Sequence, residues 1–180
     1  MCFRFPGLEP GPREVIAKRS RPRLKAGEAK IFMKPPVRLQ RPTLLVADLP
    51  RALAFWRDTL GFEEVFTKDS DAASYSYTVF GIPRGTPVRF CVLGTPGQRN
   101  CLALTEVPGL PPVTATPRRA AVVVECADFD RVVERSRALG LHVFPEETLL
   151  TKDGRKGRET GILDFDGNLA AVYLITEDRT

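Results

Sequence analysis

The chain has 180 residues, and 27 Lys or Arg against 22 Asp or Glu give it a formal net charge of +5. All of that excess lies in residues 1–32, which carry eight basic and three acidic residues, whereas residues 33–180 carry nineteen of each sign. A folded part without net charge has no overall electrostatic attraction to nucleic acid, so we expect no nucleic-acid partner. No run of eighteen apolar residues is present, so we expect no membrane partner either.

Residues 1–38 are predicted to be a basic, disordered extension of a single domain. They are rich in Pro, Arg and Lys and lack hydrophobic periodicity. A transit peptide is a competing interpretation, but Glu9, Glu14 and Glu28 are unusual in such leaders. Met33 starts the stretch MKPPVRLQ, which comes just before the first predicted strand, so the domain could begin there. We expect the extension to be dispensable for folding.

The first predicted module covers residues 39–107. The apolar run 42–48 predicts a strand, and Asp48 is placed to cap the helix that follows. Pro50 suits the first turn of this helix, and Gly61 is placed to end it. Further strands are predicted at 63–69, 74–81, 88–94 and 101–107.

The four cysteines have no Cys-x-x-Cys spacing, which argues against a zinc site or a secreted disulfide framework. A predicted hairpin turn at Thr95–Gly97 would place Cys91 opposite Cys101. No apolar signal segment follows the N-terminus, so we expect a cytoplasmic protein with reduced thiols.

A proline-rich linker, 107–117, leads into a second predicted module at 118–177. This module repeats the first, because the Asp48 and Arg51 pattern recurs at Asp128 and Arg131. Asp128 is therefore predicted to cap a second helix. The remaining strands of this module are predicted at 120–128, 141–148, 160–165 and 168–175.

The basic stretch 151–158 lacks the order of a phosphate-binding P-loop, and no helix follows it. We predict a solvated hairpin loop. Arg158 and Glu159, where this loop re-enters the sheet, are expected to reach the rim of the ligand site.

Three stretches, VADLPRALAFWRDTLGF, ADFDRVVERSRALGL and ILDFDGNLAAVYL, resemble motifs of the vicinal oxygen chelate superfamily. That superfamily includes glyoxalase I, bleomycin-resistance proteins and extradiol dioxygenases. In the third stretch Phe165 stands where the family usually has proline. The resemblance implies an α+β fold in which a single domain at 39–177 consists of two βαβββ modules forming an open curved cup.

Metalloenzymes of this family bind a divalent ion in the cup through His or Glu at fixed strand positions. The matching positions here are Arg41, Ala103, Ala121 and Ala171. His142 is the only histidine, so the two-histidine site of an extradiol dioxygenase cannot form. We therefore predict no metal and no cofactor. The competing possibility is an all-carboxylate site built from Glu106, Glu125 and Asp164.

Strand alternation assigns residues to the cup face, together with those matched positions. The predicted ligand-binding residues are Arg41, Thr43, Ala103, Ala121, Glu125, Ala171 and Tyr173. Arg41 could hold a carboxylate or phosphate, and Glu125 could accept from an amine or act as a weak candidate base. These two residues could instead pair with each other or face solvent. An aromatic wall could come from Tyr75, Tyr77, Phe80 and Trp56, although Trp56 also suits the core.

The sequence thus predicts a metal-free protein that binds or sequesters a small organic ligand and could form a homodimer. The alternative is an enzyme of the same superfamily, a lyase, isomerase or dioxygenase, with an atypical site. A degenerate module that serves only in assembly is a third possibility.

Overall fold

The computed structural model describes residues 39–177 and contains an α+β domain whose compact unit begins at Leu39. The predicted extension at 1–38, including Met33, lies outside the described residues. No helix of the described part is long and apolar enough to cross a membrane.

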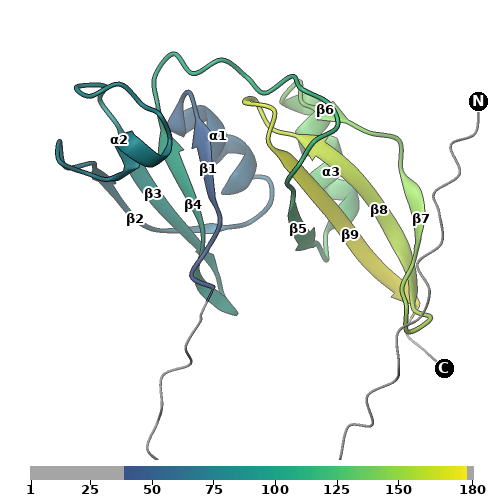
Figure 1. Cartoon of the computed structure of the whole chain (residues 1–180). Helices are drawn as coiled ribbons and strands as arrows, with labels where there is room; N and C mark the ends of the chain where they lie inside the picture. Colours follow the sequence, from purple (N-terminus) through teal and green to yellow (C-terminus); the bar gives the residue numbers. More distant parts are fainter. Residues whose placement is uncertain (1–38, 178–180) are drawn as a thin grey trace, which may run out of the picture. The chain divides into compact units, whose positions relative to one another are not determined.

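Two sheets of the same strand order form the domain (Figure 1). The first runs β1-β4-β3-β2 and the second β5-β9-β8-β6, with β7 paired to β8. In each sheet the first strand pairs in parallel with the last, and the other pairs are antiparallel. The first module comprises β1 (Thr43–Val46), α1 (Leu49–Trp56), β2 (Glu63–Asp69), α2 (Ser76–Val79), β3 (Arg89–Thr95) and β4 (Gln98–Glu106). The second comprises β5 (Val122–Glu125), α3 (Phe129–Ala138), β6 (His142–Val143), β7 (Glu147–Leu150), β8 (Lys156–Leu163) and β9 (Leu169–Glu177).

The two helices that cover the sheets begin differently. The Asp48 carboxylate accepts a hydrogen bond from Arg51 N at 2.8 Å and Pro50 lies in the first turn, so the predicted cap of α1 is confirmed. Asp128 is the N-cap residue of α3, as predicted, but its side chain makes no cap hydrogen bond. Its backbone, with ψ of 51°, departs from the extended conformation that a cap needs, and its carboxylate accepts from Arg131 Nε instead.

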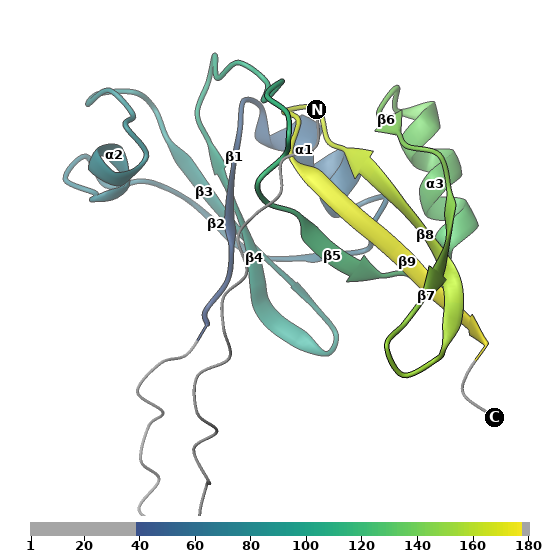
Figure 2. The same ribbon diagram turned by 45° about the vertical axis from the view of Figure 1, so that its right-hand side comes forward.

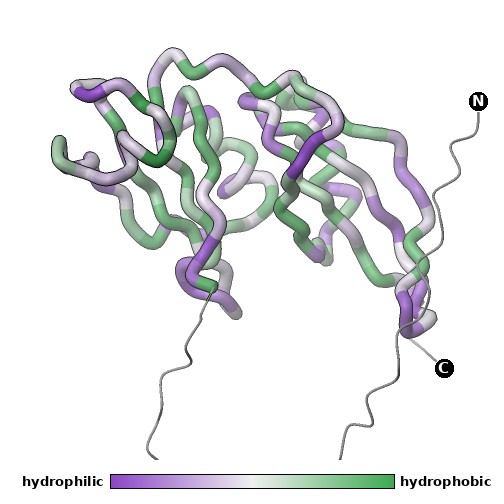
Figure 3. Tube along the Cα trace, in the orientation of Figure 1, coloured by the Kyte–Doolittle hydropathy of each residue, from purple (hydrophilic) through white to green (hydrophobic). Residues whose placement is uncertain are grey.

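One hydrophobic core receives residues from both modules. Phe55 and Trp56 of α1 and Phe129 and Val132 of α3 belong to the same buried cluster. Hydrophobic residues are frequent along the strands of both sheets, while the tip of the β7–β8 hairpin is hydrophilic (Figure 3).

The turn between β8 and β9, residues 164–168, joins the modules. Trp56 Nε1 donates to Asp164 Oδ2 at 3.0 Å, and Asn168 Nδ2 donates to Leu45 O at 3.2 Å. Ala47 N donates to Asp166 Oδ1 at 3.0 Å. Since these bonds connect side chains of the second module to β1, to α1 and to Ala47 between them, the two modules share one buried joint, and the β8–β9 turn lies beside α1 (Figure 2).

Two predicted strands form differently in the structure. The segment 74–81 contains the short helix α2, because Tyr77 turns inward and its hydroxyl donates to Thr86 O at 2.9 Å. The segment 141–148 does not form one strand, since it divides around Pro145 into β6 and the start of β7.

The hairpin of β3 and β4 turns where the sequence predicted, with Thr95 paired to Gln98. Its register is different, because an irregularity between Leu93 and Thr95 shifts the pairing and Cys91 faces Leu104. Cys91 and Cys101 are therefore not opposite each other, and both are free thiols whose pKa is raised by burial.

Candidate functional site

Each sheet has one face packed against the core and one opposite face, called here the free face. In the first sheet Leu44 and Val46 pack into the core, so Thr43 and Leu45 lie on the free face. In the second sheet Val122 and Val124 contact the core, so Glu125 lies on the free face, and so does its cross-strand neighbour Tyr173.

The structure places the seven predicted site residues in two groups. Arg41, Thr43 and Ala103 belong to the first sheet or its approach, with Thr43 paired to Ala103. Glu125, Ala171 and Tyr173 belong to the second sheet, and Ala121 directly precedes β5. Among residues 39–177, Arg41 and Glu125 form no ion pair with each other.

Side chains of the protein itself occupy part of the free face of the first sheet. The Arg41 guanidinium lies over the Phe90 ring, 5.5 Å from its centroid. Arg41 precedes β1 and Phe90 lies on β3, and β4 lies between these two strands. The Arg41 side chain therefore crosses β4, where Ala103 is fully buried. Arg41 thus has an intramolecular cation–π partner.

The insertion between β2 and β3 covers the other end of that face. Leu45 packs against a separate buried cluster formed by Tyr77, Ile82, Val88 and Val107. The predicted aromatic wall is therefore wrong as a ligand surface. Tyr77 is part of this cluster and Trp56 is part of the main core, while Tyr75 and Phe80 are exposed.

The free face of the second sheet is open and acidic. Strand register places four residues in one cross-strand row, in the order Glu147, Glu159, Tyr173 and Glu125. The Tyr173 hydroxyl donates to Glu125 Oε2 at 3.3 Å. Burial and the neighbouring Glu125 carboxylate both raise the pKa of Tyr173. Glu125 is exposed, so it lacks the burial on which a role as general base depended.

A cavity of ≈ 250 Å³ opens beside this row. Gly161 and its cross-strand partner Ala171 lie at its floor, and the side chains of Phe144 and Leu169 pack against Gly161, where a Cβ would lie 2.9 Å from the Phe144 ring. Glu147 and Glu159 stand at its rim as cross-strand partners. Val123, on the same face, is 67% exposed. A narrow apolar floor with carboxylates beside it suits an organic cation.

The alternative all-carboxylate metal site is not assembled. Glu106 Oε1 accepts from Leu49 N at 2.7 Å and holds the start of α1, while Asp164 accepts from Trp56. Between residues 39 and 177, no group of three His, Cys, Asp or Glu is placed to hold a metal ion. His142 is exposed and stacks edge-on against Phe144 at 4.5 Å.

The two residues expected at the site rim lie on opposite faces of β8. Arg158 donates to Asp130 at 2.7 Å and to Glu146 at 2.6 Å and lies over Phe129 of α3, so it does not reach the free face. Glu159 does reach it. Sequence reasoning missed Glu147, because its place beside Glu159 depends on the β7–β8 register.

The model of the Glyoxalase/Bleomycin resistance protein/Dioxygenase superfamily matches residues 38–172. No curated protein shows significant sequence similarity to the chain. A glyoxalase family protein from Bacillus cereus has a similar structure, with a TM-score of 0.62 at 16% identity over 81% of this chain and 98% of that one.

Two further structures are similar. A glyoxylase/bleomycin resistance protein/dioxygenase domain from Frankia sp. has a TM-score of 0.53 at 19% identity, covering 77% of this chain and 98% of that one. A mutant of the fosfomycin resistance protein FosX from Listeria monocytogenes, complexed with Mn(II) and 1S,2S-dihydroxypropylphosphonic acid, has a TM-score of 0.51 at 22% identity, covering 75% and 90%. At these identities the likeness establishes the fold, and the α+β prediction and the family resemblance are confirmed.

Proposed function

Because the chain belongs to the glyoxalase/bleomycin resistance protein/dioxygenase superfamily, we propose that it is a metal-free protein that binds a small organic ligand. The ligand lies on the free face of the second sheet and carries a cationic group. The observation that carries this proposal is the cavity floored by Gly161 and Ala171 beside the carboxylates of Glu147 and Glu159.

The charges of this face define the ligand class. Glu147, Glu159 and Glu125 lie in one row, and Tyr173 is the only other member. Within residues 39–177, the lining of the cavity contains no Lys or Arg to neutralise the carboxylates. A protonated amine at the rim would therefore gain charge-assisted hydrogen bonds, while a flat apolar group could rest on the small residues of the floor.

The residues at the four matched positions support a metal-free protein. Arg41 is engaged by Phe90, and the other three positions are alanines without a donor atom. Elemental analysis of the purified full chain should find no stoichiometric Fe, Mn, Ni or Zn. Chelator should leave the unfolding midpoint unchanged, because loss of a bound metal would lower it. About one metal per chain would contradict this part of the proposal.

Calorimetric titration with 2-naphthylmethylammonium tests the ligand site. We expect binding that is weakened about tenfold in the Glu147→Gln, Glu159→Gln double variant, as for loss of a hydrogen bond to a charged group. Ala171→Leu should also weaken binding by filling the floor. Glu134→Gln, at an exposed position on α3, is the matched control and should bind as the parent does. Equal affinity of all four proteins would place the ligand elsewhere.

A homodimer and a cytoplasmic location remain part of the proposal. The exposed Val123 on the free face is the kind of apolar contact that a second copy could cover. Light scattering during size exclusion measures the mass of the assembly, and a monomer at all concentrations would contradict the dimer.

A further inference from the structure

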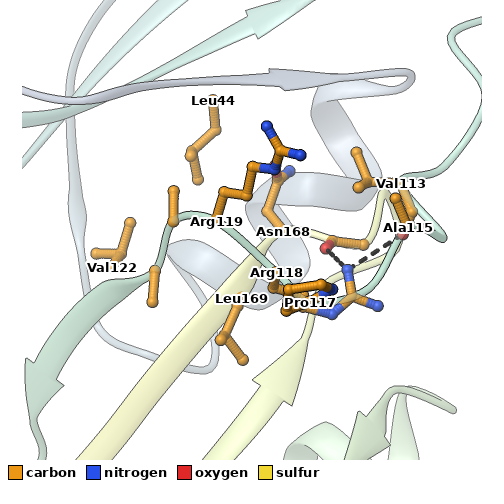
Figure 4. A pocket seen from close by; sticks show the side chains of 12 residues that line it. Leu44, Val113, Ala115, Pro117, Arg118, Arg119, Val122, Asn168 and Leu169 are labelled. Atoms are coloured by element: carbon orange, nitrogen blue, oxygen red, sulfur yellow. Dashed lines mark hydrogen bonds between the residues drawn. The ribbon is translucent and has the colours of Figure 1, made fainter. Parts of the chain in front are cut away.

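A second cavity, of ≈ 310 Å³, lies at the joint between the modules (Figure 4). We propose that this joint cavity binds a small apolar organic anion whose charged group is held by Arg119. Three segments line it: β1, residues 113–122 leading into β5, and the start of β9 with its preceding turn. Among the lining residues are Leu44, Ala121, Val122, Gly167, Asn168 and Leu169.

The charge of the joint cavity is positive. In the part of the chain that the structure describes, its lining includes the two arginines Arg118 and Arg119 and no Asp or Glu. Arg118 is committed to the backbone, because its Nη1 donates to Val113 O at 3.2 Å and to Gly167 O at 2.7 Å. Arg119 has no ion pair or side-chain hydrogen bond with any residue between 39 and 177. Its side chain lies between Leu44 and Asn168 in Figure 4.

The walls are held together before any ligand enters. Val113 N donates to Asp166 O at 2.7 Å, which ties the linker to the β8–β9 turn. Asn168 Nδ2 donates to Leu45 O, which ties the same turn to β1. Gly167 has φ of 82°, and a Cβ there would lie 2.2 Å from Val113 O, so the linker sits directly on this glycine. A cavity whose three walls are bonded to one another is a preformed site.

These features specify the chemical class of the ligand. The side chains of Leu44, Val122 and Leu169 offer apolar surface for a ring or a short chain. The planar guanidinium of Arg119 matches a carboxylate or sulfonate with two parallel hydrogen bonds. The charge preference is opposite to that of the cavity on the second sheet, so the two sites accept different ligands.

The experiment uses the full chain and 2-naphthoate, with the neutral 2-naphthamide for comparison. We expect 2-naphthoate to bind and Arg119→Met to weaken its affinity about tenfold or more. Arg119 is exposed, so this variant should fold. Arg99→Met, on the β3–β4 hairpin, removes an exposed arginine outside the cavity and should bind as the parent does. Ala121→Phe should abolish binding by filling the space.

Two controls make the proposal falsifiable. Equal affinity for 2-naphthoate and 2-naphthamide, unchanged in Arg119→Met, would overturn the assignment of an anion. Absence of binding by both compounds would overturn the cavity as a site. Excess 2-naphthylmethylammonium should not displace 2-naphthoate, because its ammonium group is directed to Glu147 and Glu159, which do not line the joint cavity. Displacement would show one shared site and overturn the proposal, while leaving the cation proposal intact.

Discussion

The two modules share a strand order, but their free faces differ in how far the chain itself covers them. Between β2 and β3 the first module inserts α2, which packs onto its free face. At the equivalent place, between β6 and β8, the second module inserts β7, which pairs with the edge of the sheet. The insertion thereby covers the first free face around Leu45, and the second free face remains open.

The two insertions cover their sheets differently because they contain different numbers of side chains that become buried. The first contains Tyr77 and Ile82, which become buried on the sheet. The second, β7, has three exposed residues and one half-buried residue, and it pairs through its backbone with β8, so it adds a strand instead of covering a face. One topology can thus provide a structural face and a ligand face, depending on a single insertion.

The largest expected effect comes from opening the closed face. Tyr77→Ala removes a buried ring and its hydrogen bond to Thr86 O, so we expect the free energy of unfolding to fall by about 3 kcal/mol. Tyr173→Ala, on the open face, should cost less than about 1 kcal/mol. Urea unfolding measures both. Equal losses would show that the two faces contribute alike to stability.

The second prediction compares the repeated Asp residues. Asp48→Ala removes a cap bond to Arg51 N and should lower the free energy of unfolding by about 1 kcal/mol. Asp128→Ala removes an exposed contact with Arg131 and should change it by less than about 0.5 kcal/mol. The same unfolding assay distinguishes them, and a larger loss in Asp128→Ala would contradict the cap geometry seen here.

Local signals in the sequence predicted much of the fold. The cap at Asp48, the turn at Thr95–Gly97 and the core strands of both modules follow from residue types a few positions apart. The helix α2 did not, because alternation in the segment 74–81 imitates a strand, and only the burial of Tyr77 against a distant cluster decides otherwise.

The site was less predictable because it depends on register. Glu147, Glu159, Tyr173 and Glu125 come from four strands, and their alignment in one row is not contained in any local pattern. Strand alternation predicted that Arg41 lies on a ligand-facing surface. It could not show that the Arg41 guanidinium makes a cation–π contact with Phe90 of another strand.

Arg41 provides the third prediction. Arg41→Ala removes the cation–π contact with Phe90, and we expect the free energy of unfolding to fall by about 0.5–1 kcal/mol. If Arg41 were the ligand anchor that the sequence suggested, the variant would also weaken binding of an acidic ligand by about 1.5–3 kcal/mol. We expect the affinity for 2-naphthoate to be unchanged. A lower affinity of the variant in calorimetric titration would show that Arg41 belongs to the ligand site.

The smallest effect concerns Asp166, a buried residue of the second module that contacts Ala47 and Arg51 of the first. Burial raises the pKa of this carboxyl, the Asp164 and Asp48 charges act in the same direction, and Ala47 N and Arg51 act against them. Its Oδ2 is buried without a hydrogen-bond partner within the described residues. The folded state therefore binds this proton more tightly than the unfolded state does.

The sign of the pH dependence follows. A carboxyl whose folded pKa lies above its unfolded pKa contributes stability below the unfolded value, about 4, and loses it as pH rises through the folded value. Asp166→Asn keeps an oxygen to accept from Ala47 N but cannot ionise. Its stability should decline less than that of the parent as pH rises above about 4, measured by urea unfolding. Asp69→Asn, at an exposed position, should retain the parent's slope. If Asp166→Asn keeps that slope too, the Asp166 carboxyl does not carry the pH dependence of the joint.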